Sequence, residues 1–142
     1  MAVARIFSLR QVYTKTNTVK IMLGEGEHEV VSNNRRLVVT CSNVTFAGRG
    51  ASRTTVRGGF GIFNRMNVFF EHLNVTNPQG SGFWMDGGET NVEVLDCIIQ
   101  NCTRNGMRVY GGATVVATRC DFMENGYCGV AARGSKYKSK IE

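Results

Sequence analysis

One sequence pattern occurs three times between Asn67 and Ser135. Residues 67–88, 91–112 and 114–135 align with one another at a spacing of about 24 and then 23 residues. The aligned apolar positions are Val68, Val92 and Val115; Phe70, Val94 and Ala117; Leu73, Cys97 and Cys120; and Val75, Ile99 and Phe122. A fixed period of this length indicates stacked repeats, none of which can bury its apolar face alone.

The local pattern within each repeat indicates β-strands. Apolar and polar residues alternate with a period of two, as in residues 92–99 and 106–112, and Gly, Asn and Asp lie between the runs. Such runs are typical of short, half-buried strands, and none is long enough for a helix. One repeat therefore holds about three strands, which is the length of one coil of a parallel β-helix with coils about 4.8 Å apart.

Residues 37–59 contain the sequence Val-Thr-Phe-x-Gly-x-Gly followed by Thr-x-Val. This arrangement is similar to the opening coils of the pectate lyase and pectin esterase superfamily, and the three repeats resemble its right-handed parallel β-helix. The resemblance extends over nearly the whole chain and implies a fold rather than an activity. We therefore predict an all-β protein, a right-handed parallel β-helix solenoid of about five coils.

At 142 residues, with 42% hydrophobic residues and 17 glycines, the chain suits a single turn-rich domain. We expect this domain to span residues 1–135, with coils over residues 16–135. Apolar residues at helical spacing predict a short N-terminal capping helix within residues 1–15. Residues 136–142 are expected to form a basic tail. Because no cap follows the last repeat, we expect a homo-oligomer through the uncapped C-terminal coil.

Gly58 and Gly59 align in sequence with Gly87 and Gly88, which follow a strand in the first repeat. In this register residues 60–66 contain roughly five residues of excess length. Insertions in solenoids emerge from turns, so this segment is interpreted either as the wall of a binding groove or as a locally packed loop.

Side chains that alternate with the buried positions form two surface columns. Their predicted members are Thr55, Trp84, Arg108 and Ala131, and beside them Arg57, Asp86, Tyr110 and Arg133. Trp84 and Tyr110 are expected to stack on pyranose rings, while the arginines bind uronate carboxylates. The predicted ligand-binding residues are Trp84, Asp86, Arg108, Tyr110, Arg133 and Arg57. The alternative is that they form ordinary cross-strand contacts.

The predicted function is a non-catalytic binding or structural module that presents a rigid surface to a glycan or to partner chains, with an acidic polysaccharide as the expected ligand. The alternative is a polysaccharide-modifying enzyme, a uronate lyase or epimerase, with Arg108 and Asp86 as its catalytic residues. The superfamily's lyases hold Ca²⁺ with several acidic residues, and only Asp86 lies in these columns. We therefore expect no metal site and no cofactor, with Ca²⁺ required only by a lyase.

A further outward column contains His72, Asp96 and Arg119. His72 and Asp96 are one coil apart and could form a minimal acid/base pair. No nucleophile aligns with them, so ordinary surface pairing is favoured.

The remaining composition limits partners and location. The net charge of +6 is moderate, and only a fragment of an interleaved basic and aromatic surface is present, so nucleic acid is not expected as a partner. Residues 1–10 do not resemble a signal peptide and no apolar run is long enough to span a membrane. Five cysteines, with Cys97 and Cys120 in one inward column, indicate reduced buried thiols and a cytoplasmic protein, although the chain gives no firm location.

Overall fold

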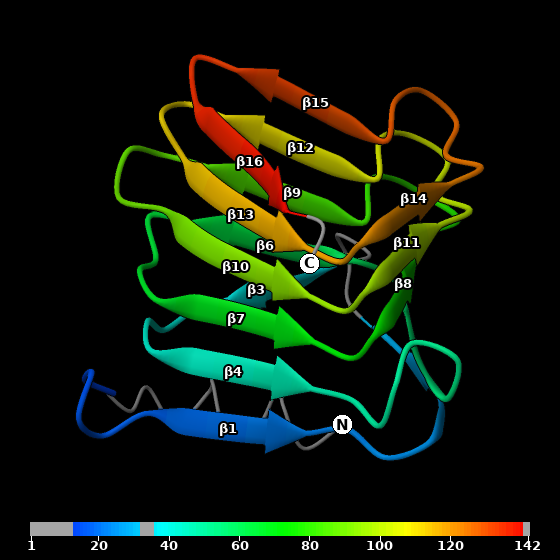
Figure 1. Cartoon of the computed structure of the whole chain (residues 1–142), viewed down its shortest axis with the longest axis horizontal. Coiled ribbons are helices and arrows are strands. Elements are labelled where there is room, and N and C mark those ends of the chain that lie inside the picture. The colour runs from blue at the N-terminus through cyan, green and yellow to red at the C-terminus, as the bar shows by residue number, and fades with distance from the viewer. Residues whose placement is uncertain (1–12, 32–35, 141–142) are drawn as a thin grey trace.

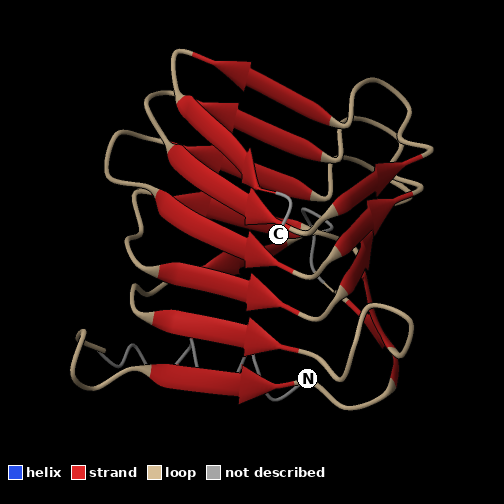
Figure 2. Ribbon diagram, viewed as in Figure 1, coloured by secondary structure: helices blue, strands red, loops and turns tan. Residues whose placement is uncertain are grey.

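A computed structural model of the chain describes residues 13–31 and 36–140. In these residues the structure contains β-strands and no helix (Figure 2). The strands form three parallel sheets, and successive strands of the chain belong to sheets A, B and C in turn. The predicted parallel β-helix of about five coils is confirmed: each complete coil contributes one strand to each sheet, and sheet A has one further strand at the C-terminal end.

Strands of the same sheet lie one above another from β1 upward (Figure 1). Sheet A consists of β1 (Val19–Met22), β4 (Val44–Ala47), β7 (Val68–Glu71), β10 (Asn91–Leu95), β13 (Thr114–Thr118) and β16 (Lys136–Lys140). Sheet B consists of β2 (Gly26–Glu29), β5 (Thr54–Arg57), β8 (Asn74–Thr76), β11 (Ile98–Gln100) and β14 (Asp121–Met123). Sheet C consists of β3 (Leu37–Val39), β6 (Phe60–Phe63), β9 (Phe83–Asp86), β12 (Met107–Tyr110) and β15 (Val130–Arg133).

The aligned apolar columns point into the space between the three sheets. Val68, Val92 and Val115 are partners in register, and each is at most 1% exposed. Four phenylalanines fill the middle coils, among them Phe46 and Phe70, whose rings stack at 5.1 Å. Burying one such side chain contributes about 1.5–3 kcal/mol, so the stacked columns provide most of the stability of the fold.

Cysteines occupy part of the same core. Cys97 and Cys120 lie at equivalent positions of successive coils and are free thiols. The Cys120 Sγ lies 3.3 Å from the carbonyl oxygen of Val94. Burial raises the pKa of the Cys97 thiol to about 12, so this side chain acts as a small apolar group.

Two predicted boundaries differ from the structure or lie outside it. The predicted capping helix falls largely on residues 1–12, which lie outside the described residues, and residues 13–15 are not helical. The expected basic tail is instead a strand over Lys136–Lys140, β16, which pairs with β13 and places Tyr137 beside Val115. Alternating lysines on an edge strand oppose pairing with further strands. Association through the C-terminal coil stays a prediction.

The register expected for the second coil is also wrong. Only Gly58 and Gly59 connect β5 to β6, and Phe60 pairs with Phe83. Gly59 therefore takes the place of Gly82 before the sheet C strand, rather than the place of a glycine after it. Residues 60–63 are a regular strand and not an insertion.

Candidate functional site

The outer surface of sheet C carries the aromatic and arginine residues that the repeats predict. Trp84, Arg108 and Ala131 are partners in register on β9, β12 and β15. Beside them Asp86 pairs with Tyr110, and Tyr110 pairs with Arg133. The structure thus brings together five of the six predicted ligand-binding residues.

Arg57 does not belong to this surface. It lies on β5 in sheet B, where its partners are Glu29 and Thr76. The two-residue turn after β5 explains the error, because it removes the spacer that the other coils have before their sheet C strand. Thr55 is displaced to sheet B for the same reason.

The centre of the surface is a stack of guanidinium groups and aromatic rings, which we call the arginine–tryptophan cluster: Arg36, Trp84, Arg108 and Tyr110. The Cζ atoms of Arg36 and Arg108 lie 4.2 and 4.4 Å from the centre of the Trp84 ring. Arg108 also lies 4.3 Å from the centre of the Tyr110 ring. These distances are those of cation–π contacts, in which each guanidinium lies over the face of a ring.

Arg36 reaches the cluster because Gly61 leaves room for it. Gly61 precedes Trp84 in the surface column, and a Cβ atom there would lie 3.3 Å from Cδ of Arg36. Phe63 packs edge-on against Trp84 at 6.0 Å and also faces Arg36. Sequence reasoning missed Arg36 and Phe63. A correct register for the second coil would have placed Phe63 on the same face as Trp84, whereas Arg36 precedes β3 and reaches Trp84 through the length of its side chain.

The electrostatics of the cluster leave positive charge at the surface. Burial, followed by the nearby charge of Arg108, lowers the pKa of Arg36 below its usual value. Among the described residues, Arg108 and Arg133 form no ion pair. Within the same part of the chain, Nε of Arg108 and Nε1 of Trp84 are buried without a hydrogen-bond partner. Arg108 and Trp84 therefore each have an unpaired N–H group, and no described side chain neutralises the charge of Arg108.

Asp86 lies at the border of the cluster without neutralising it. Its main-chain oxygen accepts a hydrogen bond from Thr90 Oγ1 at 2.7 Å. No ion pair joins its carboxylate to Arg108 or to any other described residue. In the described residues, no three His, Cys, Asp or Glu side chains come together in a way that could hold a metal ion.

Comparison with known proteins agrees with this fold. A family model described as a right handed beta helix region matches residues 21–142. The chain belongs to the right-handed β-helix family. Neither the curated proteins nor the solved structures gave a significant match to it. The described residues of this right-handed β-helix include no apolar helix of membrane-spanning length.

The further outward column predicted for this right-handed β-helix lies in a turn and contains an ion pair. His72, Asp96 and Arg119 each have a positive φ, between 51° and 58°, at the bend from sheet A to sheet B. Nε and Nη2 of Arg119 donate to the two oxygens of Asp96 at 2.7 and 3.0 Å. Nδ1 of His72 lies 3.9 Å from Asp96, beyond hydrogen-bond distance.

This ion pair makes Asp96 a poor proton acceptor. Its hydrogen bond to Arg119 is the main cause that lowers the pKa of Asp96. A carboxylate already held by two guanidinium nitrogens has little tendency to take a proton from a substrate. The right-handed β-helix thus brings the three predicted residues together, and their geometry is that of a structural pair.

Proposed function

We propose that this right-handed β-helix is a non-catalytic binding module whose sheet C surface takes an acidic glycan. The observation that carries the proposal is the position of Arg108. Its guanidinium is held against Trp84 and Tyr110 and meets no carboxylate among the described residues. A guanidinium in this state keeps its charge and its planar fork of donors for a ligand.

The cluster favours recognition of the ligand's anionic groups over stacking on its rings. Arg36 and Arg108 already lie over the Trp84 ring, and Arg108 lies over Tyr110. Pyranose rings would have to displace these guanidinium groups, whereas a uronate carboxylate would bind to that of Arg108 directly. We therefore revise the expected role of the two rings: they position arginines, and the arginines bind carboxylates.

The β-helix contributes rigidity and direction. Trp84, Arg108 and Ala131 occupy three successive coils of one sheet, with a rise of about 4.8 Å per coil. Arg133 lies one coil beyond Tyr110 and extends the positive surface. Side chains held on paired strands lose little conformational freedom on binding, which favours an extended polymer over a single sugar.

The test measures binding and turnover together. The purified chain is titrated with polygalacturonate and with a neutral polysaccharide such as dextran, with and without Ca²⁺, while the formation of unsaturated products is followed. We expect saturable binding of polygalacturonate alone, without products. Arg108→Gln should weaken this binding about tenfold or more, because a charge-assisted contact is lost.

Arg119→Gln is the matched control. It removes the same side chain from a surface position that is already paired with Asp96, so binding should stay within about twofold of the wild type. Absence of binding to any acidic polymer would overturn the proposal. Turnover that disappears in Arg108→Gln would instead support the lyase or epimerase alternative.

A further inference from the structure

The turns between sheets B and C differ in length, and the difference creates a notch. Residues 77–82, 101–106 and 124–129 connect these sheets in the third, fourth and fifth coils. In the second coil only Gly58 and Gly59 do so. The third-coil turn therefore stands on one side of a floor made by two glycines, and Val30 and Val31, which follow β2, stand on the other.

Only glycine fits this floor. Gly58 and Gly59 have φ values of 137° and 87°, in the region that side chains rarely adopt. A Cβ atom on Gly58 would lie 2.5 Å from Cβ of Val30, and one on Gly59 would lie 2.7 Å from the carbonyl oxygen of Ser81. The backbone of the second coil thus approaches both neighbouring turns closely.

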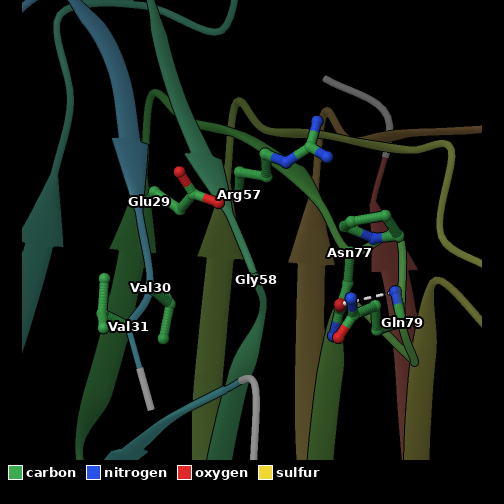
Figure 3. Close-up of a pocket in the computed structure, with 8 residues that line it drawn as sticks. Glu29, Val30, Val31, Arg57, Gly58, Asn77 and Gln79 are labelled. Carbon is green, nitrogen blue, oxygen red and sulfur yellow. Dashed lines mark hydrogen bonds between the residues drawn. The ribbon is translucent and has the colours of Figure 1, made fainter.

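The notch is a pocket of about 280 Å³ (Figure 3). Its lining residues are Glu29, Val30, Val31, Arg57, Gly58, Asn77, Pro78 and Gln79. Asn77, only 4% exposed, fixes one wall: its Nδ2 donates to the Ser81 carbonyl at 2.8 Å and its Oδ1 accepts from the Gln79 amide at 3.1 Å. The opposite wall presents Val31, which is 93% exposed.

Two opposite charges face this pocket without neutralising each other. Glu29 and Arg57 are partners in register on β2 and β5. Neighbours of opposite charge on paired strands usually attract. Yet among the described residues neither side chain forms an ion pair. In Figure 3 the Arg57 side chain extends toward the turn that carries Asn77, away from Glu29.

We propose that this notch binds a small zwitterion, a free α-amino acid with an aliphatic side chain. The ligand's ammonium group binds the Glu29 carboxylate, and its carboxylate binds the Arg57 guanidinium. Its aliphatic group packs against Val30, Val31 and Pro78, which form the apolar part of the lining. A zwitterion satisfies both charges at once, whereas a ligand with one charge leaves the other repelling it. The volume is at the small end for ligand pockets, so it suits a single amino acid.

The site is separate from the sheet C surface. Glu29 and Arg57 lie on sheet B strands, and the pocket lining includes no member of the arginine–tryptophan cluster. The proposal therefore does not depend on the glycan-binding function, and each can fail alone.

Calorimetric titration of the full chain with L-leucine tests the site. N-acetyl-L-leucine lacks the ammonium charge and L-leucinamide lacks the carboxylate, so both should bind at least about tenfold more weakly than L-leucine. Glu29→Gln and Arg57→Gln should each weaken L-leucine binding by about tenfold or more for the same reason.

Matched controls come from exposed residues of the same types elsewhere. Glu93→Gln on β10 and Arg49→Gln should bind L-leucine as the wild type does. Arg108→Gln should also leave leucine binding unchanged while it weakens polygalacturonate binding. The absence of saturable binding at millimolar L-leucine would overturn the proposal. Binding of either blocked analogue as tight as that of L-leucine, or wild-type binding by Glu29→Gln and Arg57→Gln, would also overturn it.

Discussion

Arg108 and Arg119 both lie at the surface of the β-helix, but their neighbours in the preceding coil differ. For Arg119 this neighbour is Asp96, whose two oxygens accept hydrogen bonds at 2.7 and 3.0 Å. For Arg108 it is Trp84, whose ring centre lies 4.4 Å from the guanidinium. The stacking of coils positions both arginines equally well, and the residue one coil earlier decides what each can do.

A carboxylate neutralises an arginine, whereas an aromatic ring only orients it. Cation–π contacts at exposed sites contribute about 0.5–1 kcal/mol and leave the charge in place. Exposed ion pairs contribute a similar amount, about 0–1 kcal/mol, but they occupy the donor fork. Arg108 is therefore available to a ligand because its neighbour in the preceding coil is a ring, whereas Arg119 is occupied by the carboxylate of Asp96.

We expect the largest effect on binding when Arg108 is given a carboxylate partner, as Arg119 already has. Ala131 is its partner in register on β15, and Ala131→Glu places an acid beside the guanidinium. We expect affinity for polygalacturonate to fall about tenfold or more, because the new ion pair occupies the fork and adds repulsion toward the polymer. Titration calorimetry measures the loss. Ala131→Gln, of nearly the same size, is the control, and equal affinities of the two variants would exclude Arg108 as the binding group.

Removal of the ring should have the next largest effect. Trp84→Leu keeps an apolar side chain but ends the contacts to Arg36 and Arg108, so we expect stability to fall by about 1–2 kcal/mol. Polygalacturonate affinity should fall several-fold, because Arg108 is no longer held in one orientation. Urea denaturation and calorimetry measure the two effects. Phe69→Leu, a half-buried aromatic on β7, is the control, and unchanged binding in Trp84→Leu would contradict an orienting role for the ring.

The sequence predicts the sheets well where each coil has the same length. Val68, Val92 and Val115 align in sequence and pair in register in the structure. The prediction fails at Gly58 and Gly59, because a two-residue turn makes this pair resemble the glycines that follow a sheet C strand. Because of this one error in register, Arg57 is predicted on the wrong sheet and β6 is interpreted as an insertion.

Other features could not be predicted from the spacing of the aligned residues. Arg36 joins the cluster by extending across Gly61 to Trp84, and side-chain reach of this kind depends on space rather than on register. The strand β16 has a single inward apolar residue, Tyr137, so its sequence alone looks like a basic tail. The pocket at Gly58 arises from the difference between neighbouring turn lengths, which no single repeat contains.

The ion-paired turn should affect stability and not binding. Asp96→Asn keeps a residue suited to the positive φ of 52° while it removes the charge, so we expect a loss of about 0.5–1 kcal/mol at neutral pH. Because the hydrogen bond from Arg119 lowers the pKa of Asp96, the pair stabilises the fold above the ordinary aspartate pKa of about 3.9. This contribution disappears as the pH falls through the lower native value. Urea denaturation from pH 7 to pH 2.5 should therefore show wild type and variant converging, and a constant difference would contradict the ion pair as its source.

His72 should matter least of the residues compared. Its Nδ1 lies 3.9 Å from Asp96, and both oxygens of that carboxylate already accept hydrogen bonds from Arg119. His72→Asn keeps a residue that tolerates the positive φ of 58°, so we expect a change in stability of about 0.3 kcal/mol or less by urea denaturation. A loss as large as that of Asp96→Asn would mean that His72 and Asp96 form a coupled pair, and the acid/base interpretation of this column would then regain support. A negligible loss of stability would mean that this column stabilises the fold through the ion pair between Arg119 and Asp96, whereas Arg108 keeps its donors for a ligand.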